Sequence, residues 1–153
     1  MSIGLKTMAD DIISILQAST KTALAAMADA SIEFGLRTVN DIFGYKRPSG
    51  ILVGVGDISI MEETIAVNFD TEVIIPIVIY SKNPRAETAQ ASNIALAEEI
   101  LEELLTPTHL DLPHGGTILN IPRVIPTPVI SNENVYLQQV LIEVKLERTV
   151  KYT

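Results

Sequence analysis

The two histidines of the chain lie close together in the sequence and have the widest choice of chemistry. His109 and His114 flank Asp111 in the order His-x-Asp-x-x-His. Two imidazoles and one carboxylate are the ligand set of iron sites that keep open positions for substrate. Such ligands must converge on one point, and here all three fall within one short segment that also contains proline and glycine. We therefore expect a polar surface loop and no metal.

A second group of residues matches nucleotide-binding and nucleophile motifs only in part. Gly54-x-Gly56-x-x-Ser59 has two of the three glycines of a dinucleotide fingerprint, which must open a helix that faces a pyrophosphate. Ile58 and Ile60 continue a strand pattern instead, so we expect a bulge or a close backbone approach. The chain contains neither Gly-x-x-x-x-Gly-Lys-Ser/Thr nor Gly-x-Ser-x-Gly, and it has no cysteine. We therefore expect no catalytic residues and no cofactor.

Charged side chains gather on one predicted helix and beside the strands. The helix carries four glutamates in like-charge pairs four residues apart: Glu98, Glu99, Glu102 and Glu103. Basic pairs flank the strands: Lys46 with Arg47, and Lys82 with Arg85. We expect both groups to be solvated. The alternative is an acidic surface that meets the basic pairs of a neighbouring subunit.

Apolar side chains spaced three and four residues apart predict two helices. The first has the stripe Leu5, Met8, Ile12, Ile15 and Leu16, with Asp10 and Asp11 outside it, and Ala23, Met27, Ala30 and Phe34 could continue the stripe. The second runs from Pro84 to about Leu105 after an Asn83 cap, with the stripe Ile94, Ala97, Leu101 and Leu104. Residues 20–50 are not placed by these patterns.

Alternating apolar residues predict the strands. One opens at residues 51–53, and a longer one alternates from residue 65 and becomes apolar on both faces beyond Val73, so that end should be buried on both sides. Pro76 lies in this run and cannot donate to a neighbouring strand, so a bulge or an unpaired edge is expected there. An extended edge segment near residues 118–130 and a final strand follow; Val140, Ile142, Val144 and Leu146 of that strand share one face.

These elements predict an α+β fold in a single domain over residues 1–153. We expect a mainly antiparallel or mixed sheet of four to five strands with a long β-hairpin. Two to three α-helices should pack mainly on one face.

Composition excludes several classes of function. The chain has 153 residues and a formal net charge of -8, so it lacks the basic surface that binding to nucleic acid or anionic lipid requires. The most apolar run, residues 73–79, is far shorter than the ~20 residues of a membrane helix. Asp10 and Asp11 interrupt the N-terminal apolar stretch, which argues against a secretory leader. We expect a soluble protein that is not exported.

The order of these elements resembles the tail terminator proteins of tailed bacteriophages. The corresponding stretches are residues 5–16, 51–80, 84–105 and 118–151, and the most similar segment is Phe69-Asp-Thr-Glu-Val-Ile-Ile-Pro-Ile-Val-Ile-Tyr80 before the Asn83-Pro84 helix start. The resemblance rests on element order and hydrophobic pattern and carries over no single functional residue. The family implies a structural virion protein of the tail or neck, assembled in the host cytoplasm.

The resemblance also implies partners. Subunits would form a hexameric ring that caps the tail tube, stops its polymerisation and offers a surface to the head-completion or connector protein. DNA would pass through the ring without being recognised by sequence, and an acidic bore would repel its phosphates. Two segments are predicted as assembly interfaces: the hairpin tip Glu62, Glu63 and Thr64, and the loop 108–116 with His109, Asp111 and His114.

Three alternatives to a tail terminator stay open at this point. The first is another neck or head–tail connector protein of the same virion. The second is a small metal-dependent enzyme that uses His109, Asp111 and His114. The third is a soluble two-component adaptor that acts as a monomer or dimer.

Overall fold

The computed structural model describes residues 4–60 and 68–151. Within them lie four α-helices and one sheet of seven strands, so the predicted α+β class is confirmed, with more strands than expected because β1, β3 and β6 have only three residues each. The helices are α1 Leu5–Gln17, α2 Thr22–Ala26, α3 Val39–Gly44 and α4 Ala86–Leu104. The strands are β1 Ile32–Phe34, β2 Ser49–Val53, β3 Ile58–Ile60, β4 Asn68–Asn83, β5 Thr117–Pro126, β6 Ile130–Asn132 and β7 Val135–Lys151.

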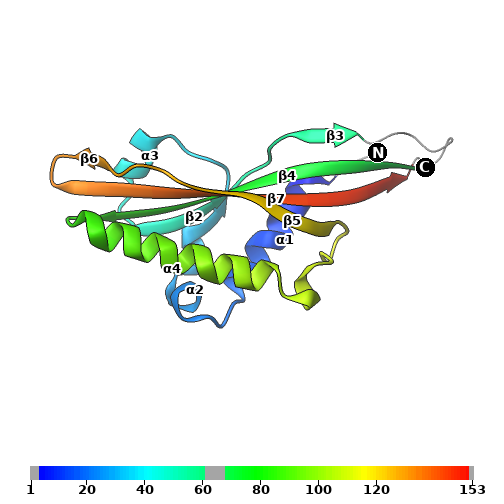
Figure 1. The fold of residues 1–153 in the computed structure, drawn as a ribbon, viewed down its shortest axis with the longest axis horizontal. Helices are drawn as coiled ribbons and strands as arrows, with labels where there is room; N and C mark the ends of the chain where they lie inside the picture. The colour runs from blue at the N-terminus through cyan, green and yellow to red at the C-terminus, as the bar shows by residue number, and fades with distance from the viewer. Residues whose placement is uncertain (1–3, 61–67, 152–153) are drawn as a thin grey trace.

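The two longest strands form the centre of the sheet. β4 and β7 pair antiparallel over their whole length, from Asn68 opposite Lys151 to Asn83 opposite Tyr136. β2 and β3 pair with the outer side of β4, β1 adds to β2 in parallel, and β5 and β6 pair with β7. Figure 1 shows β4 and β7 running the length of the molecule, with α4 lying along one face. No helix among the described residues is long and apolar enough to cross a membrane.

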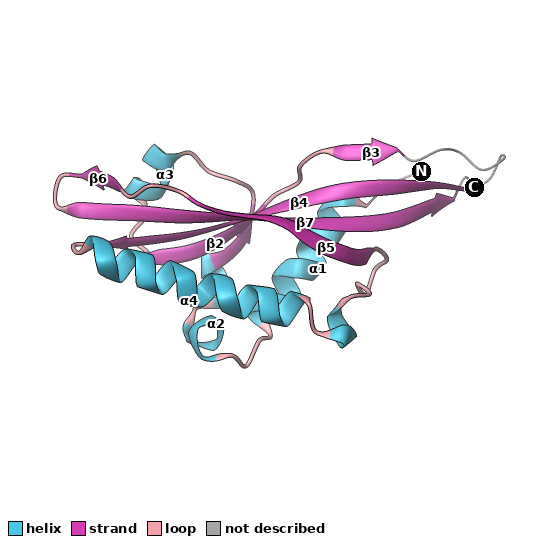
Figure 2. Ribbon diagram, viewed as in Figure 1, coloured by secondary structure: helices cyan, strands magenta, loops and turns pink. Residues whose placement is uncertain are grey.

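Apolar side chains are buried on both faces of the sheet. The larger core lies between the sheet and the helices α1, α2 and α4, and Ile75, Ile77 and Ile79 of β4 point into it. The smaller core lies on the opposite face, where α3 covers Leu52 and Tyr80. Figure 2 shows α3 on the side of the sheet away from α4. The prediction that β4 is buried on both sides beyond Val73 is therefore confirmed.

The glycines that precede β3 lead into a bulge opposite Ile74, where the Gly56 amide donates to the Ile74 carbonyl and the Ile74 amide donates to the Asp57 carbonyl. Val53 pairs with Ile77, whereas Ile58 pairs with Val73, so the register shifts by one residue between β2 and β3. The Gly54 amide donates to the Pro76 carbonyl, which puts the missing proline N–H on the bulged side. A Cβ at Gly56 would lie 2.9 Å from the carbonyl oxygen of Ile74. The close backbone approach expected at the glycines is confirmed, and the bulge lies two residues from Pro76, opposite Ile74.

β5 is the outer strand on the β7 side of the sheet, as expected for the segment near residues 118–130. It contains Pro122 and Pro126, and its pairing with β7 shifts register twice. The side chains of Leu119 and Val124 are exposed.

The start and buried face of α4 differ from the sequence prediction. The helix begins at Ala86 with Arg85 as its cap residue, because Asn83 still belongs to β4 and its side chain accepts from the Arg85 amide in a turn. The buried positions are Ala89, Asn93, Leu96, Ala97, Ile100 and Leu104. Ala97 and Leu104 of the predicted stripe are therefore buried as expected, whereas Ile94 is 52% exposed; Leu105, which caps the helix, is 48% exposed.

The first helix also differs at its end and in its polar residues. α1 stops at Gln17, whose side-chain amide donates to the carbonyls of Asp29 and Ile32 and holds the returning chain. The expected continuation through Phe34 is wrong, because Phe34 lies in β1. Asp11, placed outside the apolar stripe by sequence, is buried.

Tyr80 has a buried hydroxyl that finds no hydrogen-bond partner among the described residues. Burial raises the pKa of this phenol above its ordinary value; nearby Arg47 opposes the rise, and Glu33 and Tyr45 add to it. A raised folded-state pKa in an acid gives stability that is present below about pH 10 and is lost as pH rises through the folded pKa. The unpartnered hydroxyl costs stability at neutral pH, and the raised pKa adds a further loss of stability that begins at about pH 10.

We expect Tyr80→Phe to raise the free energy of unfolding by about 1 kcal/mol at pH 7, because it removes an unpartnered buried hydroxyl. The gain should grow between pH 9 and 11. Lys82, whose pKa burial lowers, is present in both proteins, so its titration cancels. Urea unfolding of both proteins at several pH values measures the difference, and a gain that does not change with pH would contradict the assignment.

Candidate assembly surfaces

The loop between α4 and β5 contains the three predicted interface residues, and each contacts a different neighbour. His109 Nδ1 lies 2.9 Å from the Glu103 carbonyl oxygen and 3.7 Å from the Glu103 carboxylate. The Asp111 carboxylate accepts from the Thr117 hydroxyl at 3.1 Å. His114 contacts neither of them. The structure therefore does not bring the three residues to one point.

His114 contacts a residue that sequence reasoning overlooked, the buried Asp11 of α1. One carboxylate oxygen of Asp11 lies 2.6 Å from His114 Nδ1, and the other accepts from the His114 amide at 3.1 Å. The His114 side chain is exposed at the other end of this pair. Asp11 thus holds the loop against α1 while the imidazole stays accessible. The available signal was its place beside Met8 and Ile12 on the helix, at the border of the buried stripe.

No group of three or more His, Cys, Asp or Glu side chains that could hold a metal occurs among the described residues. The other predicted interface segment, Glu62, Glu63 and Thr64, lies outside the described residues.

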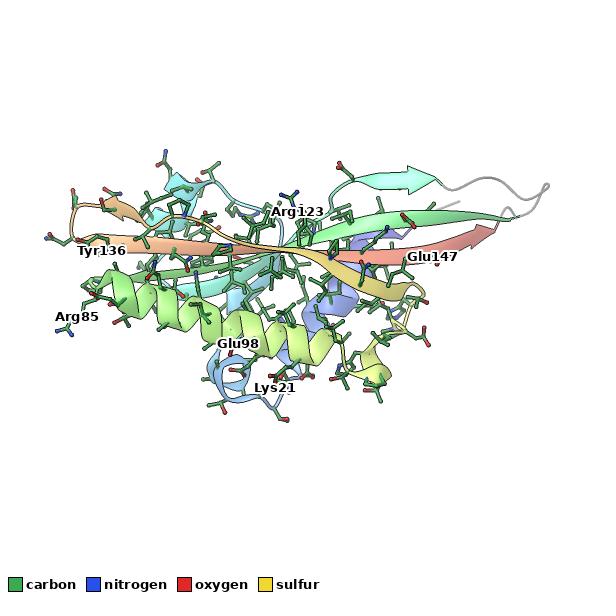
Figure 3. The ribbon with its side chains drawn as sticks, in the orientation of Figure 1. Lys21, Arg85, Glu98, Arg123, Tyr136 and Glu147 are labelled. Carbon is green, nitrogen blue, oxygen red and sulfur yellow. The ribbon has the colours of Figure 1, made fainter. Side chains whose placement is uncertain are left out.

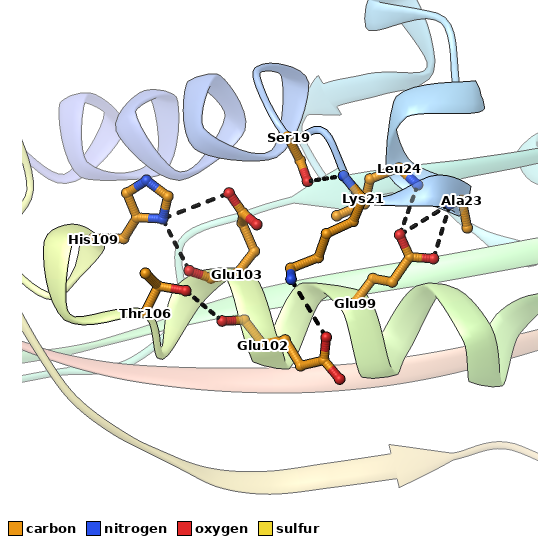
Figure 4. A network of polar contacts seen from close by, with 9 residues as sticks. All are labelled: Ser19, Lys21, Ala23, Leu24, Glu99, Glu102, Glu103, Thr106 and His109. Carbon is orange, nitrogen blue, oxygen red and sulfur yellow. Dashed lines mark hydrogen bonds and ion pairs between the residues drawn. The ribbon is translucent and has the colours of Figure 1, made fainter.

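The glutamates of α4 are only partly a solvated surface. Glu99 accepts from the amides of Ala23 and Leu24 and so holds the start of α2 (Figure 4). Glu102 pairs with Lys21 at 3.4 Å. Glu98 is exposed and has no partner within the described chain. Glu98 is therefore solvated as predicted, whereas Glu99 and Glu102 attach the α2 segment to α4.

The basic pairs likewise contain both bonded and solvated side chains. Arg47 donates to the Ala30 carbonyl at 2.5 Å and pairs with Glu33 at 3.5 Å. The side chains of Lys46 and Arg85 are exposed, and no described residue pairs with either. Figure 3 shows Arg85 at the start of α4, pointing away from the molecule.

A groove of about 480 Å³ runs between α4 and the segment that contains α2. Most of its lining consists of small side chains: Ala23, Ala26, Ala28, Ser31, Ser49, Ser92 and Ala95, together with Met27, Arg47, Pro48 and Leu96. The wall is therefore mainly apolar, and Arg47 is its charged residue.

The sheet face opposite α4 carries alternating charges beyond the part that α3 covers. Lys145 pairs with Glu72 at 3.1 Å, and Arg123 pairs with Glu143 at 3.7 Å. Glu147 stands directly opposite Glu72 in the register, a like-charge pair. Arg123 and Glu147 are both visible in Figure 3. These five side chains give the face a net negative charge.

A buried polar network fixes α4 on the sheet. Asn93 is fully buried; it accepts from the Ser81 hydroxyl at 2.6 Å and donates to the backbone and side-chain oxygens of Gln138 at 2.5 and 2.8 Å. Gln138 in turn donates to the Thr127 carbonyl at 3.1 Å. The network thus joins β4, α4, β7 and the connection after β5.

Comparison with solved structures finds a chain of similar fold in a virion. The match covers 95% of this chain and 99% of a chain in a structure described as the virion of a native gene transfer agent particle, with a TM-score of 0.54 and 13% sequence identity. The likeness therefore concerns the fold over nearly the whole of both chains. No protein-family model and no curated protein matches the sequence.

Proposed function

We propose that this chain is a structural, non-enzymatic virion protein of the tail terminator type. The observation that carries the proposal is the nearly full-length fold similarity to a chain of the gene transfer agent virion. The finer assignment, to the tail terminator type, rests on the resemblance of the element order in the sequence to that family. In this role the chain forms one domain that belongs to the tail or neck of the particle.

The proposed assembly is a closed ring, six-fold by family resemblance, on the end of the tail tube. A ring of identical subunits uses two different surfaces of each subunit. We assign the charged sheet face with Glu72, Glu143 and Glu147 to the bore, where its net negative charge would keep DNA from adhering as it passes. The loop with His109, Asp111 and His114, held by Asp11, is assigned to the contact with the tube or the head connector, as are Glu62, Glu63 and Thr64.

Native mass spectrometry tests the proposal on the purified protein, alone and mixed with the tail-tube protein of the same particle. We expect a closed oligomer near six copies, either in solution or only on the tube. An unrelated acidic protein of similar mass replaces the tube protein in the control. A strict monomer or dimer in both samples would contradict ring assembly, and binding to the connector alone would assign the chain to another part of the neck.

A further inference from the structure

The α4 helix has an exposed apolar stripe that sequence analysis had placed in the core. Ile94, Leu101 and Leu105 lie seven and four residues apart, so they share one side of the helix. Ile94 and Leu105 are about half exposed, whereas Leu101 packs partly against the core. Isolated exposed apolar side chains need no explanation, but a row on one helix side is the pattern that docks into a groove.

Two glutamates lie on the same side of α4 as the stripe. Glu87 precedes Ile94 by seven residues and Glu98 follows it by four, which places both on the same side of α4. Both are exposed, and neither pairs with any other described side chain. Along this side of α4, Glu87 precedes the apolar side chains and Glu98 lies between Ile94 and Leu101, so acidic and apolar side chains alternate.

The groove beside α2 has the complementary properties. Its wall is made of alanine and serine side chains, which leave room for larger side chains from outside. Its charged lining residue is Arg47, which also pairs with Glu33, and the preceding Lys46 is exposed without a described partner. Its volume of about 480 Å³ suits a row of aliphatic side chains better than a single one.

The stripe and the groove lie on different sides of the same helix. Ser92 lines the groove, and Ile94 follows it by two residues, so their side chains point about 200° apart around α4. In this arrangement the stripe cannot reach the groove of its own subunit. Two copies can meet, however, and the contact leaves one free stripe and one free groove, which is a heterologous contact.

We infer that the α4 stripe of one copy, Ile94, Leu101 and Leu105 with Glu87 and Glu98, docks into the α2–α4 groove of a second copy of this chain. The inference rests on the proposed ring and assigns its subunit-to-subunit contact. Apolar side chains fill the alanine-lined groove, and the glutamates face Arg47 and Lys46. Repeated around the ring, the contact forms a closed belt of α4 helices on the side of the sheet away from the charged face.

Two variants each disable one half of this contact. Ile94→Lys removes the most exposed apolar side chain of the stripe and brings a cation toward Arg47, and Ala95→Trp fills the groove from its own wall. Both positions are exposed, so both variants should fold; circular dichroism and thermal unfolding check this. Leu119→Lys is the control, because Leu119 is 43% exposed on β5 and belongs neither to the stripe nor to the groove lining. The measurement uses whichever sample, free protein or tube-bound protein, shows assembly of the natural sequence.

We expect each variant alone to self-associate about tenfold more weakly or worse, as is typical of a central interface residue. An equimolar mixture should form a one-to-one dimer and nothing larger, because only one intact stripe and one intact groove remain. Added salt should weaken association of the natural sequence. Leu119→Lys should assemble normally.

Three results would overturn this contact. Variants that form rings like the natural sequence would leave the ring in place and refute this interface. Folded variants that fail to form a dimer when mixed, or a variant that dimerises by itself, would show that the stripe and the groove are not partners. If the natural sequence assembles neither alone nor on the tube, the proposed function itself fails, and this contact fails with it.

Discussion

Gly50→Ala is expected to lower the free energy of unfolding by about 3 kcal/mol, at the upper end of the cost of overpacking. Gly50 lies in β2 directly opposite Tyr80 of β4, and the phenol ring covers the glycine. An added Cβ would contact the Tyr80 hydroxyl and lie 2.6 Å from Cζ and 2.7 Å from Cε1 of the ring. Tyr80 is fully buried beneath α3. The ring therefore has no free space into which it can move.

Gly44→Ala is the matched control for this prediction. Gly44 ends α3, close to the same core, and an added Cβ there meets no atom within 4 Å. We expect a change within about 0.5 kcal/mol, or a small gain from the reduced entropy of the unfolded chain. Urea unfolding of both variants separates the effects, and equal stabilities would show that the strand and the ring can separate at low cost.

Asn93→Leu is expected to cost about 3 kcal/mol, although leucine is similar in size and more apolar. The substitution leaves the Ser81 hydroxyl without its acceptor, and it leaves two Gln138 oxygens without their donor inside the helix–sheet interface. Buried polar groups that lose a partner carry the full cost of their desolvation. We also expect faster hydrogen exchange in α4.

Gln90→Leu is the control on the same helix, because Gln90 is exposed. It adds the same apolar side chain without breaking a buried network, so stability should change by no more than about 0.5 kcal/mol. Chemical denaturation measures both variants. If Asn93→Leu proved as stable as Gln90→Leu, the network would not hold α4 on the sheet.

The sequence predicts the strands well because their burial follows a period of two. The stripe from Val140 to Leu146 and the double burial of β4 are both observed. The bulge near Gly56 was predictable because glycine and proline act through backbone geometry, which depends little on distant residues. Local rules were therefore sufficient for the centre of the sheet.

The helix faces were harder to predict because polar residues were assigned to solvent by type. Asn93 and Asp11 are both buried. Asn93 is held by a partner 45 residues away in the chain, and Asp11 by a partner 103 residues away. The predicted stripe of α4 counted apolar residues alone, so it included the exposed Ile94 and left out the buried Asn93. The sequence pattern did not place residues 20–50 for a related reason. β1, α2 and α3 are too short to show a period, and they depend on distant contacts such as that of Glu99 with the α2 amides.

The outermost strand on the β7 side has a consequence for how copies of this protein can meet. β5 has no amide hydrogen at Pro122 and Pro126, and its register with β7 shifts twice. It therefore presents an irregular row of backbone groups. Such an edge is a poor template for a further strand, and this blocks the open-ended stacking that leads to fibres. Copies of the chain can then reach a high concentration without joining sheet to sheet, and any contact between them is left to side chains.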